Sequence, residues 1–149
     1  MIEHQEFDRR TGPASNGQDD TIFRYCNFGD LSINGSGFDG GLIDCVLRKI
    51  DWYWGLFSST AFLRTRFDNC TFRGSSFMGC RLLECHFSGC DFLLDNLGGA
   101  CSFEDCAFVE CTFDRCQFIL DNPIGRPVFA KTRWYSCTQT QCVGLDGLF

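Results

Sequence analysis

The sequence has few prolines, methionines, tryptophans and tyrosines: three, two, three and three among 149 residues. It also lacks any run of about 18 consecutive apolar residues, the length that a membrane-spanning helix requires. The first twenty residues contain no basic segment followed by an apolar one, so neither an export signal nor a membrane span is expected. Hydrophobic residues make up 44% of the chain, which excludes a disordered or collagen-like protein. The length predicts a single folded unit.

Phenylalanine and cysteine are the abundant residues, with 17 and 12 copies. Because no export signal is expected, we interpret the cysteines as reduced thiols and predict a cytoplasmic protein. No C-x-x-C pair supplies converging metal ligands. We therefore expect the cysteines to be packing residues, and we expect neither a metal nor another cofactor.

The negative charge is concentrated in one part of the chain. The net charge is −6, and residues 79–118 alone carry −5. An acidic surface repels phosphate backbones and attracts basic proteins. The expected partner is thus a protein with a basic surface, and neither direct nucleic-acid binding nor a membrane interaction is expected.

Large apolar residues recur every five positions through most of the chain. With one four-residue step and one six-residue step, the series has twenty centres: Phe23, Phe28, Ile33, Phe38, Ile43, Leu47, Trp52, Phe57, Phe62, Phe67, Phe72, Phe77, Leu82, Phe87, Phe92, Leu97, Phe103, Phe108, Phe113 and Phe118. Ten of the twelve cysteines lie two residues before a centre. A square coil, with a large and a small residue pointing inward from each side, explains this period, whereas a helix or an ordinary strand does not.

Units such as CTFRG (70–74), CHFSG (85–89) and CTFDR (111–115) resemble the pentapeptide-repeat family, whose pattern is a small residue, a polar residue, Leu or Phe, and two variable residues. The resemblance implies an all-β fold, a right-handed quadrilateral β-helix, with about five coils over residues 21–118. Leu31, Ile50 and Asp95 depart from the pattern at the small position, so distortion of the coil is expected there.

The two ends of the chain lack the five-residue frame. Residues 1–20 are predicted to be a polar N-terminal tail, mobile or loosely packed. Residues 119–149, where Pro123, Gly125 and Pro127 interrupt the period, are predicted to form an irregular C-terminal cap over the open end of the coil.

No arrangement of residues points to catalysis. His4 lies in the polar tail and His86 at an outward position, and neither has a visible catalytic partner. Paired carboxylates need a pocket to act as acid and base, and a filled coil has none inside. We therefore predict that the chain is not an enzyme and has no catalytic residues.

An outward apolar patch is the first candidate binding site. Residues one coil apart should stack, which groups Tyr53 and Trp54 with Leu93 and Leu94 on the side centred at Ile33, Trp52, Phe72, Phe92 and Phe113. An exposed patch of this kind is typical of protein interfaces. Two alternatives remain open: a disturbed frame near residue 44 turns Trp54 inward, or a terminal segment covers the patch.

An acidic end is the second candidate site. Arg64, Glu84 and Asp105 are expected to form a ladder on the side centred at Phe62, Leu82 and Phe103, and an ordinary solvated surface is the alternative. The candidate partner-binding carboxylates are Glu84, Asp91, Glu104, Asp105, Glu110 and Asp114.

These features favour a non-enzymatic inhibitor that binds another protein. One hypothesis is a bacterial immunity protein that neutralises a toxin, such as a secreted nuclease effector. The resemblance also implies an alternative, a DNA-mimicking, gyrase-binding protein of the quinolone-resistance type, for which a longer rod and an apolar C-terminal dimerisation element are expected. The short rod favours immunity. A structural scaffold remains a third hypothesis, and a homodimer is compatible with all three.

Overall fold

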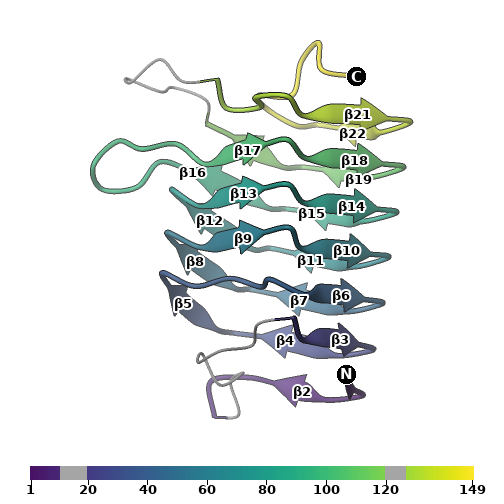
Figure 1. Cartoon of the computed structure of the whole chain (residues 1–149). Helices are drawn as coiled ribbons and strands as arrows, with labels where there is room; N and C mark the ends of the chain where they lie inside the picture. Colours follow the sequence, from purple (N-terminus) through teal and green to yellow (C-terminus); the bar gives the residue numbers. More distant parts are fainter. Residues whose placement is uncertain (11–19, 120–126) are drawn as a thin grey trace.

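The computed structural model describes residues 1–10, 20–119 and 127–149, and within these ranges every regular element is a short β-strand (Figure 1). The strands stack in parallel into four sheets, which form the sides of a rod. The fold is the right-handed quadrilateral β-helix that the resemblance to the pentapeptide-repeat family implies. In the described residues, no helix has the length and apolar character needed to span a membrane.

Two of the four sheets run the whole length of the rod, with seven strands each. Sheet A contains β1 (Ile2–Glu3), β3 (Ile22–Arg24), β6 (Gly41–Ile43), β10 (Ala61–Leu63), β14 (Arg81–Leu83), β18 (Ala107–Val109) and β21 (Arg133–Tyr135). Sheet B contains β2 (Glu6–Phe7), β4 (Asn27–Gly29), β7 (Val46–Arg48), β11 (Arg66–Asp68), β15 (His86–Ser88), β19 (Thr112–Asp114) and β22 (Thr138–Thr140).

The other two sheets are shorter. Sheet C contains β5 (Ser32–Asn34), β8 (Asp51–Tyr53), β12 (Thr71–Arg73), β16 (Asp91–Leu93) and β20 (Gln117–Phe118). Sheet D contains only β9 (Leu56–Ser58), β13 (Ser76–Met78) and β17 (Ser102–Glu104). The chain visits sheets A, B, C and D in turn, so residues about twenty apart lie one above the other.

The central residue of each strand points into the rod and stacks on its counterpart in the next coil. The rings of Phe67 and Phe87 are 4.5 Å apart and almost parallel, and those of Phe72 and Phe92 are 4.7 Å apart. These separations match the spacing between hydrogen-bonded strands, about 4.8 Å. The hydrogen bonds between successive strands therefore also set the distance between stacked rings in the core. Each buried Phe contributes about 2 kcal/mol to stability before conformational entropy is subtracted.

The small position before each strand is where the chain turns a corner. All ten cysteines predicted to point inward are buried, and none of the twelve thiols forms a disulfide. Each buried thiol donates a hydrogen bond to a carbonyl of the coil below, as Cys80 Sγ does to Phe57 O at 3.3 Å. Cysteine fits because it is short, apolar and a weak donor. The departures at Leu31 and Ile50 are accommodated inside the core.

The residue after most strands adopts a left-handed conformation. Seventeen non-glycine residues in the described ranges have a positive φ, including Trp54, Arg64 and Glu84. This conformation costs a non-glycine residue about 1–2 kcal/mol, so the core must offset a repeated local strain.

The frame proposed from the sequence is wrong at the four-residue step. Leu42 is the buried centre of β6, and Ile43 points outward. The short step lies between Phe38 and Leu42, at a place where a Cβ atom on Gly40 would lie only 2.0 Å from the carbonyl oxygen of Thr21. The chain comes so close there that only glycine fits.

The frame is also wrong at Leu97, which is 82% exposed. Residues 94–101 form a loop that projects from the side of the rod after β16 (Figure 1). Phe103 stacks on Phe77 in sheet D, one side of the coil after Phe92. The step from Phe92 to Phe103 is eleven residues instead of the usual five, so the loop is a six-residue insertion. Asp95, expected at an inward position, begins this loop.

The strands extend beyond both boundaries expected from the sequence. At the N-terminal end, β1 and β2 pair with β3 and β4, and Ile2 and Phe7 pack against the core rather than lying in a loose tail. At the C-terminal end, β21 and β22 continue sheets A and B, with Cys137 and Cys142 at the small position. The rest of the predicted tail (11–19) and part of the cap (120–126, including Pro123 and Gly125) lie outside the described residues.

Candidate functional site

The interior of the rod offers no space for chemistry, because its aromatic centres and thiols are in contact from coil to coil. Burial raises the pKa of Cys45 to about 11 and that of Cys101 to about 12, so these thiols stay protonated and poorly nucleophilic. In the described ranges, no three His, Cys, Asp or Glu side chains converge as metal ligands.

The two histidines have structural surroundings. The His4 ring stacks on the Tyr25 ring at 5.1 Å, and His86 Nδ1 contacts the Thr112 hydroxyl. Candidate sites are therefore on the outer surface.

The predicted apolar patch exists in part, at the corner between sheets C and D. Tyr53 and Trp54 touch each other, with ring centroids 4.4 Å apart, and Trp54 is 39% exposed. Leu93 and Leu94 are half-buried, and Leu93 lies two coils above Tyr53, with Arg73 between them. The alternative that turned Trp54 inward is wrong, because Trp52 fills the core position.

The inserted loop, and not a terminal segment, contacts this patch. Trp54 Nε1 donates a hydrogen bond to Asp95 Oδ2 at 2.8 Å, and the Asn96 backbone N–H donates to Tyr53 Oη at 2.7 Å. Asp95 Oδ1 also accepts from the backbone N–H groups of Leu97 and Gly99. The bond from Trp54, together with that from Gly99, lowers the pKa of the Asp95 carboxyl. The loop thus holds the Trp54 indole in one orientation.

A glycine makes the loop contact possible. The residues that follow the strands of sheet C form a column at the corner between sheets C and D. In this column Gly74 lies between Trp54 and Leu94, and it has a positive φ of 53°. A Cβ atom there would lie 2.7 Å from Asp95 Oδ2 and 2.8 Å from Asp95 Cβ. Because Gly74 has no side chain, Asp95 can pass over it and bind Trp54 in the coil below that of Gly74.

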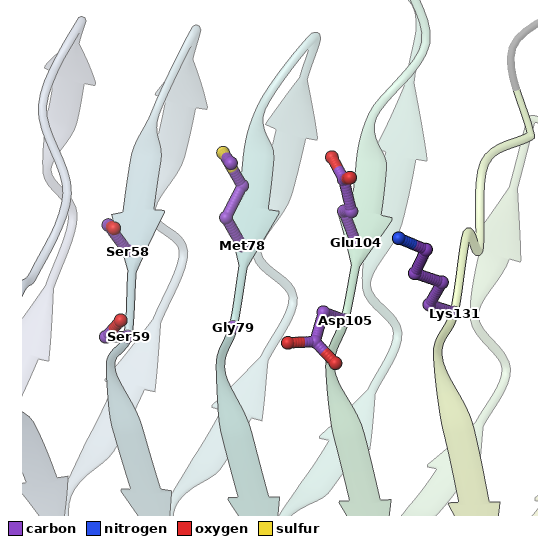
Figure 2. Close-up of a pocket in the computed structure, with 7 residues that line it drawn as sticks. All are labelled: Ser58, Ser59, Met78, Gly79, Glu104, Asp105 and Lys131. Carbon is purple, nitrogen blue, oxygen red and sulfur yellow. The ribbon is translucent and has the colours of Figure 1, made fainter.

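A shallow groove of about 550 Å³ crosses the outer surface of sheet D (Figure 2). Four successive coils line it: Ser58 and Ser59, Met78 and Gly79, Glu104 and Asp105, and Lys131. Ser59, Gly79 and Asp105 follow the three strands of sheet D and form a column along its edge. Gly79 has no side chain, so the groove is open between Ser59 and Asp105. Figure 2 shows the Lys131 side chain directed toward the rung of Glu104, and the three ion pairs found among the described residues do not include it.

The predicted acidic residues do not form one ladder. Glu84 and Glu110 stack at the corner between sheets A and B, because Leu82 pairs with Phe108 and not with Phe103. Glu104 and Asp105 belong to sheet D, so the ladder of Arg64, Glu84 and Asp105 is wrong. Asp91 lies on sheet C, and Asp114 lies on sheet B, 3.1 Å from Arg115. Phe113 likewise belongs to sheet B, and Phe118 takes the place assigned to it on sheet C.

The sequence interpretation missed that the patch and the groove border the same narrow sheet. Trp54 stands at one edge of sheet D, and Ser59 and Asp105 stand at the other. Leu56 and Met78 lie between them and are 58% and 51% exposed. Had Phe103 been assigned to sheet D, the spacing Phe57, Phe77, Phe103 would have placed Glu104 beside Met78.

Comparisons with known proteins agree with this architecture. A family model described as pentapeptide repeats matches residues 57–92 with eight copies. A search of curated protein sequences gives no match.

Among solved structures, one trypsin-treated form of QnrB1, a plasmid-mediated fluoroquinolone resistance protein, aligns with a TM-score of 0.55 and 14% identity over 95% of this chain and 68% of QnrB1. A second QnrB1 form aligns with a TM-score of 0.49 and 15% identity, over 95% of this chain and 67% of QnrB1. Rfr23 from the cyanobacterium Cyanothece 51142 gives 0.35 and 11%, over 95% of this chain and 84% of Rfr23. At 14% identity, the first of these matches shows a likeness of fold alone.

Proposed function

We propose that this chain, which contains pentapeptide repeats at residues 57–92, is a non-enzymatic protein that binds and inhibits another protein. The binding surface is the outer face around sheet D, from Trp54 and the inserted loop across Leu56 and Met78 to Glu104 and Asp105. We call this region the sheet D surface.

The observation that carries the proposal is the fixed position of Trp54 next to exposed apolar side chains. Trp54 is hydrogen-bonded to Asp95 and packed against Tyr53, so little conformational entropy is lost when a partner covers it. Leu56 and Met78 extend the apolar area, and Glu104 and Asp105 border it. Aromatic anchors with a charged rim are typical of binding hot spots.

The charge of this surface favours a basic partner. Glu104 and Asp105 are exposed, and residues 79–118 carry most of the negative charge of the chain. Proteins that act on nucleic acids present basic surfaces to the phosphate backbone. We therefore propose a cytoplasmic immunity protein that occupies the basic active surface of a toxin, with a nuclease effector as the expected target.

A second candidate function rests on the fold likeness to QnrB1, which is described as a fluoroquinolone resistance protein. In this candidate the chain binds DNA gyrase in the place of DNA. The carboxylates Glu84, Glu104, Asp105, Glu110 and Asp114, which lie on several sides of the rod, would then all contribute to binding. In the immunity candidate only the sheet D surface is required.

The test is affinity capture from native lysate with matched variants. We expect wild-type protein to capture one partner stoichiometrically, and the double variant Glu104→Arg/Asp105→Arg to lose it. The control is Asp30→Arg/Asp68→Arg, which makes the same charge change on the side of sheet B. Trp54→Asp/Leu93→Asp should also abolish binding while the β-sheet circular dichroism is unchanged. Equal capture by all variants would show that the sheet D surface is not the binding site.

The identity of the captured protein separates the candidate functions. A nuclease-like partner encoded by a neighbouring gene supports immunity, and coexpression should then rescue growth of cells that produce the nuclease. For the gyrase candidate, purified gyrase should retain supercoiling activity in a fluoroquinolone when the chain is added. A wild-type chain that captures no protein would contradict both.

A further inference from the structure

A column of apolar side chains runs along the outer surface of sheet A. Pairing of the strands places five residues at the same outward position in successive coils: Ile43, Leu63, Leu83, Val109 and Tyr135. Leu83 and Tyr135 are exposed and the other three are half-buried. At about 4.8 Å per coil, this sheet A stripe is about 19 Å long.

The coil itself does not require apolar residues at this position. The same outward position in sheet B is occupied by Arg48, Asp68, Ser88, Asp114 and Thr140. Both sheets have seven strands and the same parallel pairing, so the backbone is equivalent. The sheet A stripe is therefore a property of this one side of the rod, and a continuous apolar surface of this kind indicates an interface.

The column beside the stripe has small residues in three of its five coils. Its members include Gly41, Ala61 and Ala107, whose side chains are too small to stand above the stripe. The same column also contains Arg81 and Arg133. Arg81 Nη1 donates hydrogen bonds to Cys80 O and Asp105 O, at 3.1 and 2.8 Å, which places its guanidinium at the corner toward sheet D. Asp105 and Lys131 lie at the same corner, so with Arg81 and Arg133 this edge of the face is basic on balance.

The opposite edge of the face is acidic. Glu84 and Glu110 stack there in successive coils, since the Glu84 N–H donates to Val109 O at 2.8 Å. Arg64, in the same column, is paired with Asp44 at 2.7 Å, whereas the three ion pairs of the described residues include neither Glu84 nor Glu110. The stripe therefore lies between a basic edge and an acidic edge.

We propose that this face binds a second copy of the chain, with the two rods parallel and related by a two-fold axis that runs along the rod direction in the interface. This rotation places the two stripes against each other. It also places the basic edge of each copy opposite the acidic edge of the other. Arg81 then meets Glu84 of the second copy in the same coil, and Arg133 lies one coil above Glu110 of the second copy. Each of these contacts occurs twice.

The order of charges explains why a second copy fits better than a uniformly basic or acidic partner. A basic partner would be repelled at Arg81 and Arg133, and an acidic one at Glu84 and Glu110. The same face turned by a half rotation presents the reverse order and matches both edges, which is the self-complementarity that a two-fold interface requires.

The face is narrow, and this sets the expected strength of the dimer. A strip five coils high and three residues wide measures about 24 by 10 Å, so the total buried surface lies below about 1,000 Å², the lower limit of specific interfaces. We expect reversible dimerisation with a Kd of roughly 10 μM, the range of weak, transient complexes. This inference does not depend on the proposed function.

Sedimentation velocity from 1 to 200 μM tests the proposal. Wild-type protein should shift from monomer to dimer, and Leu83→Asp should raise the Kd at least tenfold. Ser88→Asp is the matched control, because it introduces the same side chain at the same outward position of the same coil in sheet B, and it should dimerise like wild type. Asp68 and Asp114 flank Ser88 in this column, so repulsion between the carboxylates makes Ser88→Asp a stringent control for the effect of an added aspartate on the fold.

A charge exchange tests the arrangement. Arg81→Glu and Glu84→Arg should each weaken the dimer, and the double variant should recover a Kd within about threefold of wild type, because each new pair again has opposite charges. Arginine occurs at the equivalent left-handed position as Arg64, so Glu84→Arg fits the backbone. A chain that stays monomeric at 200 μM overturns the proposal, as does a dimer that is insensitive to Leu83→Asp. Failure of the double variant to recover would overturn the parallel arrangement.

Discussion

Replacement of Gly74 by alanine should separate the inserted loop from Trp54. Two penalties act at this position. The first is the left-handed backbone of Gly74, which costs an alanine about 1–2 kcal/mol. The second is the contact of the new Cβ atom with Asp95, 2.7 Å from Oδ2 and 2.8 Å from Cβ. Asp95 is held by three hydrogen bonds, so it cannot move without breaking some of them.

The magnitude of the second penalty follows from those bonds. Hydrogen bonds to a charged group contribute about 1.5–3 kcal/mol when shielded and less when exposed, as here, so we expect about 1–2 kcal/mol for displacing the loop. Gly74→Ala should therefore lower the free energy of unfolding by about 2–4 kcal/mol in total. For a chain of this size each kcal/mol lowers the Tm by about 2–4 °C.

Gly79→Ala is the matched control. Gly79 occupies the corner after the next strand and has a positive φ of 62°, but the nearest atom to its added Cβ is Ser59 Oγ at 3.6 Å, an ordinary contact. Only the backbone penalty remains, about 1–2 kcal/mol. Urea unfolding measures the difference between the variants, and the emission of Trp54 in a background with phenylalanine at positions 52 and 134 reports on the loop.

A double-mutant cycle measures how much of the penalty of Gly74→Ala comes from its contact with Asp95. In an Asp95→Gly background the clash is gone, so Gly74→Ala should cost no more than Gly79→Ala does in the wild-type background. The reasoning is refuted when Gly74→Ala and Gly79→Ala are equally destabilising and the Trp54 emission does not change.

Two further predictions concern titratable groups. Ten of the twelve thiols are buried and so are shielded from reagent, whereas Cys137 and Cys142 are partly exposed. Iodoacetamide should therefore modify Cys137 and Cys142 first in native protein and all twelve cysteines in urea, as counted by mass spectrometry. Rapid native labelling of Cys101, which is buried and whose pKa is raised by burial, would contradict the packing. The pKa of Asp95 is lowered in the folded state, so its stabilisation is complete above the unfolded value of about 3.9 and disappears as pH falls through the folded value. The stability difference between wild type and Asp95→Asn should accordingly be constant above about pH 5 and shrink as the pH falls below the unfolded value of about 3.9. A difference that does not change with pH would rule out the carboxylate as its source.

The sequence alone determined the coil and the residues that fill it. The five-residue period fixed Phe57, Phe62, Phe67 and Phe72 as inward centres, and all four are buried. It also fixed the inward direction of ten cysteines. This information is local, because each side of the coil repeats one backbone conformation, and the side-chain direction follows from position within the repeat.

Tertiary structure decided which side of the rod each residue joins. The side of the rod on which a residue lies is found by counting five-residue steps from the start of the coil. One step of the wrong length therefore moves every later residue to a neighbouring side. Leu97 completed an apolar pattern in the sequence, yet Asp95 binds Trp54 and the chain leaves the coil there, which carried Asp105 to the groove and Glu110 above Glu84. The ends were hidden for a related reason: Ile2 and Phe7 are too few to establish a period, and Gln139 is polar at a central position. Strand pairing with the adjacent coil supplied the order that these short segments could not encode by themselves.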